Sequence, residues 1–167
     1  MATVALAFPP NSNVTSNVGS LEVKQWWLFN EWNGSNPLWR GMIQDDFPNQ
    51  DDLHPSNPSP QISRIQACFH KMRGAYEHVW GNKRETAVWT KVDVQTLDPI
   101  WVRSNVRVLY PTNDSFKTTT TNFNGIVLWE DPGSQQYDLI EGNHRIDSWL
   151  KSGNPQALPS IMYIGHA

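Results

Sequence analysis

The residues best suited to chemistry lie close together near the end of the 167-residue chain. Residues 137–145 read YDLIEGNHR, in which an apolar run is followed by Glu141, Gly142, Asn143, His144 and Arg145. Glycine permits a tight turn and a close approach of the backbone. The first amides of a helix have no partner inside it and, with the helix dipole, they favour an anion. The pattern therefore predicts a phosphate site between a strand and a helix.

The side chains of this motif suit the same purpose. Arg145 offers a planar fork of donors to phosphate oxygens, and His144 adds a donor that titrates near pH 7. Asn143 can cap the helix or bond a ligand. Glu141 has two interpretations: a base or magnesium ligand beside the phosphate, or a strand-end residue that pairs with Arg145. A plain turn with an Arg145–Asp147 or Arg145–Glu141 pair is the structural alternative, because short motifs often arise by chance.

The surrounding pattern supplies the elements that would hold the motif. We expect a helix at 143–151, with Ile146, Trp149 and Leu150 inward and Gly153 at its end. Alternating or apolar runs predict strands at 86–97, 102–110, 125–130, 136–140 and 158–164. Asp98 and Pro99 mark a turn, and residues 113–124 form a polar loop.

The first half of the chain has a different composition and a different pattern of apolar residues. Residues 1–20 are rich in Asn, Ser, Pro and Thr, which predicts a flexible arm. Residues 21–32 predict a short helix, 33–37 its break and 44–60 a loop. Apolar spacing predicts a helix from Ser59 to Gly81, with Cys68 as a small buried hydrophobe on its inner face. Of nine tryptophans, four cluster and suggest either a stacking surface or, as we expect for most of them, core: Trp26, Trp27, Trp32 and Trp39.

Composition narrows the function classes. With a net charge of -3 and no basic run, we do not expect general nucleic-acid binding. One cysteine excludes an internal disulfide framework and paired-cysteine zinc sites, which favours a cytoplasmic protein. No apolar run reaches the 18 or so residues that span a bilayer, so we expect no membrane association.

These residues carry a resemblance. Residues 125–167 resemble the core of the ParB/sulfiredoxin superfamily: an apolar strand (IVLW, 126–129), a strand followed by Gly-x-His-Arg (137–145), then a strand at 158–164. The similarity extends loosely back to residue 88. It implies an α+β fold, a small mixed sheet with helices, preceded by a Trp-rich, mainly helical extension. We therefore expect an arm at 1–20, the extension at 21–87 and the domain at 88–167, packed as one unit.

The resemblance implies binding of a nucleotide such as ATP or CTP, with Mg²⁺. Phosphate contacts would come from Gly142, Asn143, His144 and Arg145, and catalysis from Glu141 and His144, with Glu141 also as metal ligand. Lys117, Arg103 and Asp98 are further candidates. Asn143 stands where sulfiredoxins carry a cysteine, and an amide cannot act as that nucleophile. An acidic residue before the glycine, as at Glu141, is similar to the free-serine kinase branch.

The expected function is phosphoryl transfer or phosphoester hydrolysis, by a phosphotransferase, nuclease or phosphohydrolase. The alternative is a non-catalytic module that binds a nucleotide or, through a Trp-rich surface, a protein partner. Exposure of the clustered tryptophans distinguishes the two, because a contiguous exposed aromatic patch favours a binding surface.

Overall fold

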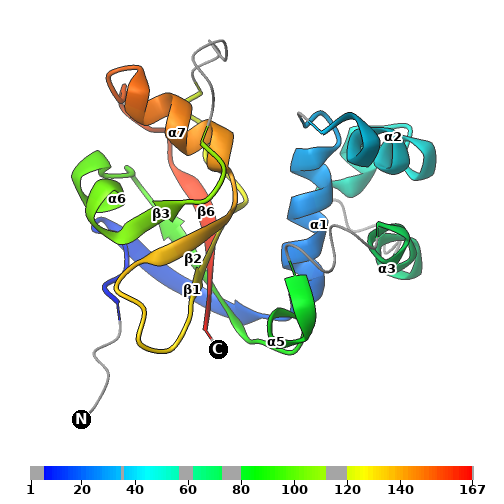
Figure 1. Cartoon of the computed structure of the whole chain (residues 1–167), viewed down its shortest axis with the longest axis horizontal. Helices are drawn as coiled ribbons and strands as arrows, with labels where there is room; N and C mark the ends of the chain where they lie inside the picture. Colours follow the sequence, from blue (N-terminus) through cyan, green and yellow to red (C-terminus); the bar gives the residue numbers. More distant parts are fainter. Residues whose placement is uncertain (1–5, 35, 57–61, 73–79, 112–119, 167) are drawn as a thin grey trace. The chain divides into compact units, whose positions relative to one another are not determined.

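A computed structural model describes residues 6–34, 36–56, 62–72, 80–111 and 120–166. The described chain is mixed α/β, with one six-stranded sheet and six α-helices among these residues (Figure 1). It divides into two compact units. The sheet unit combines Met1–Val18 with Val88–Ala167, and the helical unit is Gly19–Ala87. No helix in the described part is long and apolar enough to cross a membrane.

The sheet has the strand order β1-β2-β6-β4-β5-β3 (Figure 1). Neighbouring strands are antiparallel in the pairs β1/β2, β2/β6 and β4/β5, and parallel in β4/β6 and β3/β5. The sheet is therefore mixed. Its strands are β1 (Ser12–Val18), β2 (Trp89–Val94), β3 (Val106–Val108), β4 (Ile126–Glu130), β5 (Tyr137–Glu141) and β6 (Ser160–His166).

One face of this sheet carries the main core. Alternate residues of β2, β4, β5 and β6 point to it, because side chains of a strand alternate between faces, and Val106 of β3 joins the same cluster. Two helices, α6 (Pro99–Asn105) and α7 (Asn143–Lys151), bury their apolar side chains in the same cluster. The inward positions predicted for the last helix are confirmed, since Ile146 and Trp149 are buried and Leu150 packs against the cluster. The strand residues are Val92, Val94, Ile126, Leu128, Tyr137, Leu139, Met162 and Ile164.

Strand β1 corrects the prediction of an N-terminal arm. Six of its seven residues pair with β2, from Ser12 opposite Val94 to Val18 opposite Trp89, with an irregularity at Thr15. The segment escaped the sequence pattern because β1 is an edge strand whose middle residues are all exposed, so no apolar alternation marks it. Its backbone partners lie about seventy residues later, beyond any local signal.

The strand predicted at 102–110 is mostly wrong. Residues up to Asn105 belong to α6, and only Val106–Val108 form a strand, β3. The deciding feature is the helix start: the Asp98 carboxylate accepts a hydrogen bond from the Ile100 amide at 2.9 Å, and Pro99 occupies the first turn. The turn expected at Asp98 is therefore a helix cap.

The helical unit contains α1 (Ser20–Glu31), α2 (Pro37–Asp46), the short 3₁₀-helix η1 (Gln50–Leu53), α3 (Ile62–Lys71) and α5 (Gly81–Glu85). The helix predicted at 21–32 is confirmed as α1. Helix α2 was not predicted; the Asn36 side chain caps it by accepting from the Leu38 and Trp39 amides. Of the long helix predicted to Gly81, α3 is seen and residues 73–79 lie outside the described ranges. Gly81, with a φ of 62°, is the first residue of α5.

Aromatic rings fill the helical unit. Trp27 packs against Trp39 and Phe69 with ring centroids 5.3 and 5.4 Å apart, and Phe69 packs against Trp80 at 5.8 Å. Trp26 and Trp27 are 5% and 2% exposed, while Trp32 and Trp39 are half-buried. Of these four tryptophans, Trp26 and Trp27 are therefore core, as expected for most of them, whereas Trp32 and Trp39 keep part of their surface exposed.

Cys68 is fully buried on α3, as predicted. Burial raises the pKa of its thiol to about 12, and a hydrogen bond to Asp46 and the charge of that carboxylate act in the same direction. The thiol should stay protonated at neutral pH, and a protonated thiol is a poor nucleophile.

We expect the folded protein to be inert to 5,5′-dithiobis(2-nitrobenzoate) at pH 8, and one thiol per chain to react after unfolding in guanidinium chloride. The absorbance of the released thiolate measures both states. Stoichiometric reaction of the folded chain within minutes would contradict the buried, protonated state.

Gly165 on β6 provides a second check on the sheet unit. A Cβ atom there would lie 2.6 Å from two ring atoms of Trp89 and 2.8 Å from a ring atom of Trp129. The two indoles pack at 5.4 Å between centroids, directly where that atom would be. Only glycine fits without displacing a ring.

We expect Gly165→Ala to lower the free energy of unfolding by about 1–3 kcal/mol, because overpacking forces side chains and backbone to shift. Urea denaturation followed by tryptophan fluorescence measures it. Gly41→Ala is the matched control: Gly41 lies inside α2 with nothing within 4 Å of an added Cβ. It should be neutral or stabilising by about 0.5–1 kcal/mol. Equal effects of the two variants would rule out the packing argument.

Candidate functional site

The chain makes the strand–turn–helix that the sequence predicted. Strand β5 ends at Glu141, Gly142 is the N-cap residue with a φ of 104°, and α7 begins at Asn143. The first helical hydrogen bond runs from the Ile146 amide to the Gly142 carbonyl at 2.9 Å. An added Cβ on Gly142 would lie 2.0 Å from Ile126 Cδ1. Both the left-handed backbone and the contact with β4 therefore require glycine here.

The side chain of Asn143 has a structural role, which corrects two expectations. It makes no helix cap, and it is 8% exposed. Its Oδ1 accepts from the amides of Leu109 at 2.7 Å and Tyr110 at 3.1 Å, and its Nδ2 donates to the Leu139 carbonyl at 2.8 Å. The carboxamide is thus occupied by three backbone groups. Only the main-chain amide of Asn143 remains suited to a phosphate.

Arg145 lies between a loop and an acid. Its Nη1 donates to the carbonyls of Asn124 at 2.9 Å and Asn122 at 3.3 Å, in the loop before β4. Its Nη2 is 4.0 Å from Glu141 Oε1, one helical turn earlier. This distance fits the interpretation in which Glu141, at the end of the strand, pairs with Arg145. The guanidinium is held in place by groups of the protein.

Glu141 and His144 differ in access to solvent. Glu141 is 7% exposed, whereas His144, in the first turn of α7, is partly exposed. A general base must come within hydrogen-bond reach of the proton that it removes. His144 is therefore the better placed of the two to touch a ligand that approaches from solvent.

The further candidates do not join this turn. Arg103 Nη2 donates to the Leu150 carbonyl at 3.3 Å and to Asn154 Oδ1 at 3.1 Å, at the C-terminal end of α7. Helix α7 has nine residues, so at 1.5 Å per residue its two ends lie about 13 Å apart. Asp98 caps α6. Lys117 lies outside the described residues.

The described residues contain no ready-made cluster of metal ligands. Among them, no group of three or more His, Cys, Asp or Glu side chains could hold a metal ion. Glu141 has a guanidinium beside it, and that charge opposes a second cation. We therefore assign no metal to this turn.

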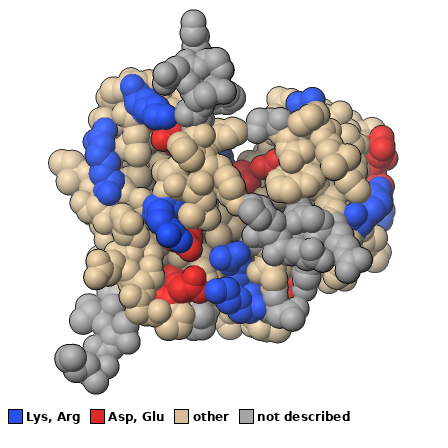
Figure 2. Space-filling view, viewed as in Figure 1, with Lys and Arg blue, Asp and Glu red and all other residues tan. Residues whose placement is uncertain are grey.

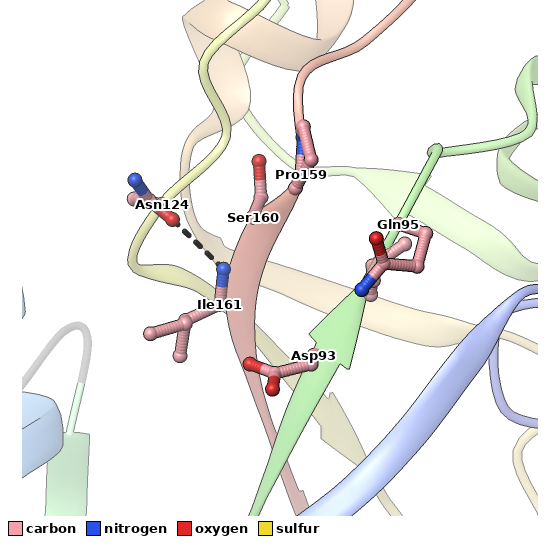
Figure 3. Close-up of a pocket in the computed structure, with 7 residues that line it drawn as sticks. Asp93, Gln95, Asn124, Pro159, Ser160 and Ile161 are labelled. Carbon is pink, nitrogen blue, oxygen red and sulfur yellow. Dashed lines mark hydrogen bonds between the residues drawn. The ribbon is translucent and has the colours of Figure 1, made fainter.

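A pocket at the same end of the sheet was missed by the sequence reasoning. It is a cavity of about 290 Å³ where β2 ends and β6 begins (Figure 3). Three separate stretches of sequence build it, so no local motif marks it. A charged residue inside a strand of valines, Asp93, was the one available signal. The lining residues are Asp93, Val94, Gln95, Asn124, Pro159, Ser160 and Ile161.

Charge on the visible surface is dispersed. On the face drawn in Figure 2, the lysines and arginines of the described residues lie in small separate groups, several of them beside acidic side chains. That face of the described chain presents no continuous basic stripe of the kind that tracks a nucleic-acid backbone.

Family models, curated proteins and solved structures were each compared with the chain, and none of them matches it. The ParB/sulfiredoxin resemblance therefore stays a prediction from the motif residues.

The three hydrogen bonds of Asn143 give a testable stability effect. We expect Asn143→Ala to lower the free energy of unfolding by about 1–3 kcal/mol, because it leaves two amides and a carbonyl without their partner. Asn143→Asp should also destabilise, since a carboxylate oxygen would then face the Leu139 carbonyl. Urea denaturation measures both, with exposed Gln135→Ala as the control. An Asn143→Ala protein as stable as that control would show that the bridge contributes nothing.

Proposed function

We propose that the protein binds a nucleotide or another phosphorylated small molecule at the first turn of α7. The observation that carries the proposal is the Gly142 turn: a buried strand ends, a glycine turns in the left-handed region, and a nine-residue helix starts at once. The first amides of such a helix lack acceptors within it and attract an anion. A phosphate held there would accept main-chain hydrogen bonds with the helix dipole behind them.

Two side chains strengthen the anion site. Arg145 has five N–H donors in its fork, and its bonds to the loop carbonyls engage Nη1. These bonds fix the guanidinium beside the turn, so little side-chain entropy is lost when a ligand arrives. His144 is partly exposed and can donate to a phosphate oxygen. Glu141, beside Arg145, offsets part of that positive charge, so the main-chain amides of the turn carry much of the attraction for the anion.

The proposal is for binding rather than for phosphoryl transfer. Glu141 is nearly buried and lies next to Arg145, and the described residues offer no metal group. Phosphoryl transfer depends on positioned charge and usually on Mg²⁺. The resemblance to the ParB/sulfiredoxin superfamily supports a nucleotide, such as ATP or CTP, as the ligand. A protein-binding role through exposed tryptophans has less support, because Trp26 and Trp27 are buried and Trp39 packs against Trp27.

We expect Arg145→Ala to weaken nucleotide binding at least tenfold, about 1.4 kcal/mol, through loss of a charge-assisted contact. Titration calorimetry with ATP, CTP, GTP and pyrophosphate measures it. Arg103→Ala is the matched control, because that arginine bonds the far end of α7 and should leave binding unchanged.

Since Arg145 also holds the loop before β4, a second variant separates binding from folding. His144→Asp places a carboxylate in the first turn of α7, where it stabilises a helix but repels a phosphate. It should keep the unfolding temperature of the wild type or raise it while binding is lost. A wild-type protein that binds none of the four ligands, or a His144→Asp variant that binds as well as wild type, would refute the proposal.

A further inference from the structure

The pocket between the ends of β2 and β6 is separate from the groups used in the phosphate proposal. At about 290 Å³ it lies near the lower limit of small-molecule sites, which begin at roughly 300 Å³. All seven lining residues belong to the sheet unit. Asp93 of β2 is paired with Ile161 of β6, and Figure 3 shows the Asn124 amide oxygen bonded to the Ile161 backbone.

Asp93 is the only ionisable residue in the lining. Its side chain is half-buried, and it makes no hydrogen bond or ion pair with any residue that the structure describes. A partly desolvated carboxylate without a partner is unfavourable compared with one that accepts N–H donors. The Asp93 carboxylate is therefore available to bind a cationic group of a ligand.

The wall opposite Asp93 is fixed by hydrogen bonds. Asn124 Oδ1 accepts from the Ile161 amide at 2.8 Å, which identifies that atom as the oxygen. Ser160 Oγ accepts from the Phe123 amide at 3.1 Å and donates to the Leu158 carbonyl at 2.9 Å. These bonds pin the loop before β4 to the start of β6. The pocket is thus formed in advance, and binding need not order its wall.

The groups present favour an organic cation over a metal ion. A single carboxylate cannot complete the oxygen shell of Ca²⁺ or Mg²⁺, and the described residues contain no metal-binding cluster. The amide oxygen of Gln95, at the exposed rim, can accept a second N–H. Val94, Pro159 and Ile161 add apolar surface that suits a short alkyl chain.

We propose that this pocket binds a small organic cation with N–H donors, an alkylammonium or alkylguanidinium, whose charged head pairs with Asp93. The proposal is independent of the phosphate site. It assigns Asp93 as the binding residue and Asn124 as a positioning residue of the wall.

The test is titration of the full chain with butylamine and butylguanidine, followed by ¹H–¹⁵N chemical shifts. We expect a Kd on the order of 1 mM for ligands of this size, with the largest shifts at the amides of residues 93–95, 124, 160 and 161. Asp93→Asn keeps the shape and removes the charge, and it should weaken binding at least tenfold. Asp52→Asn, an exposed aspartate of the helical unit, is the matched control and should bind like wild type.

Neutral and anionic probes complete the experiment. Butanol and butyrate should not bind measurably. Butanol binding as tight as that of butylamine, equal affinity of Asp93→Asn and wild type, or no shifts with either cation would overturn the proposal. So would binding of a Gly-Lys-Gly peptide without binding of butylamine, because the cation would then come from a protein. His144→Asp should bind butylamine like wild type, so the two sites can fail separately.

Discussion

The buried carboxamide of Asn143 is the contact on which this end of the sheet depends. It bonds one carbonyl of β5 and the two amides that follow β3, a strand of only three residues at the sheet edge. Two neighbouring residues also connect the start of α7 to the sheet. Gly142 lies against Ile126 of β4, and Arg145 holds the carbonyls of the loop before that strand. The start of α7 is thus tied to three strands, which makes it a rigid platform.

The elements that local patterns could predict are those whose signals lie within them. Strands β4 to β6 carry apolar runs, and α7 has a glycine on each side. Strand β1 and helices α2 and α6 could not be predicted the same way. The edge strand is exposed and polar, so only its pairing with β2 defines it. The two helices are set by the caps Asn36 and Asp98, whose effect outweighs the weak apolar pattern that follows.

At the candidate site, the sequence indicated which residues matter better than it indicated which contacts each of them makes. Glycine at position 142 was expected for a tight turn, and that turn is present. Asn143 and Arg145 were expected to bind a ligand, and the structure adds a supporting role for each, because each also bonds backbone groups, 34 and 21 residues away. Sequence spacing cannot show such partners. Asn124 makes the point most clearly, because its carbonyl holds Arg145 while its side chain holds β6. One loop residue thereby contributes to the support of two candidate sites that share no motif.

The pairing of β1 with β2 has a consequence for the history of the chain. Val18 and Trp89 are opposite one another in the sheet, so the backbone leaves and re-enters it at adjacent points, about 5 Å apart. All the residues between them except Val88 form the helical unit, Gly19–Ala87. That unit has the topology of an insertion at a hairpin, a place where added or lost sequence leaves the host sheet intact. During synthesis, however, β1 must wait for the whole insertion before its partner strand exists.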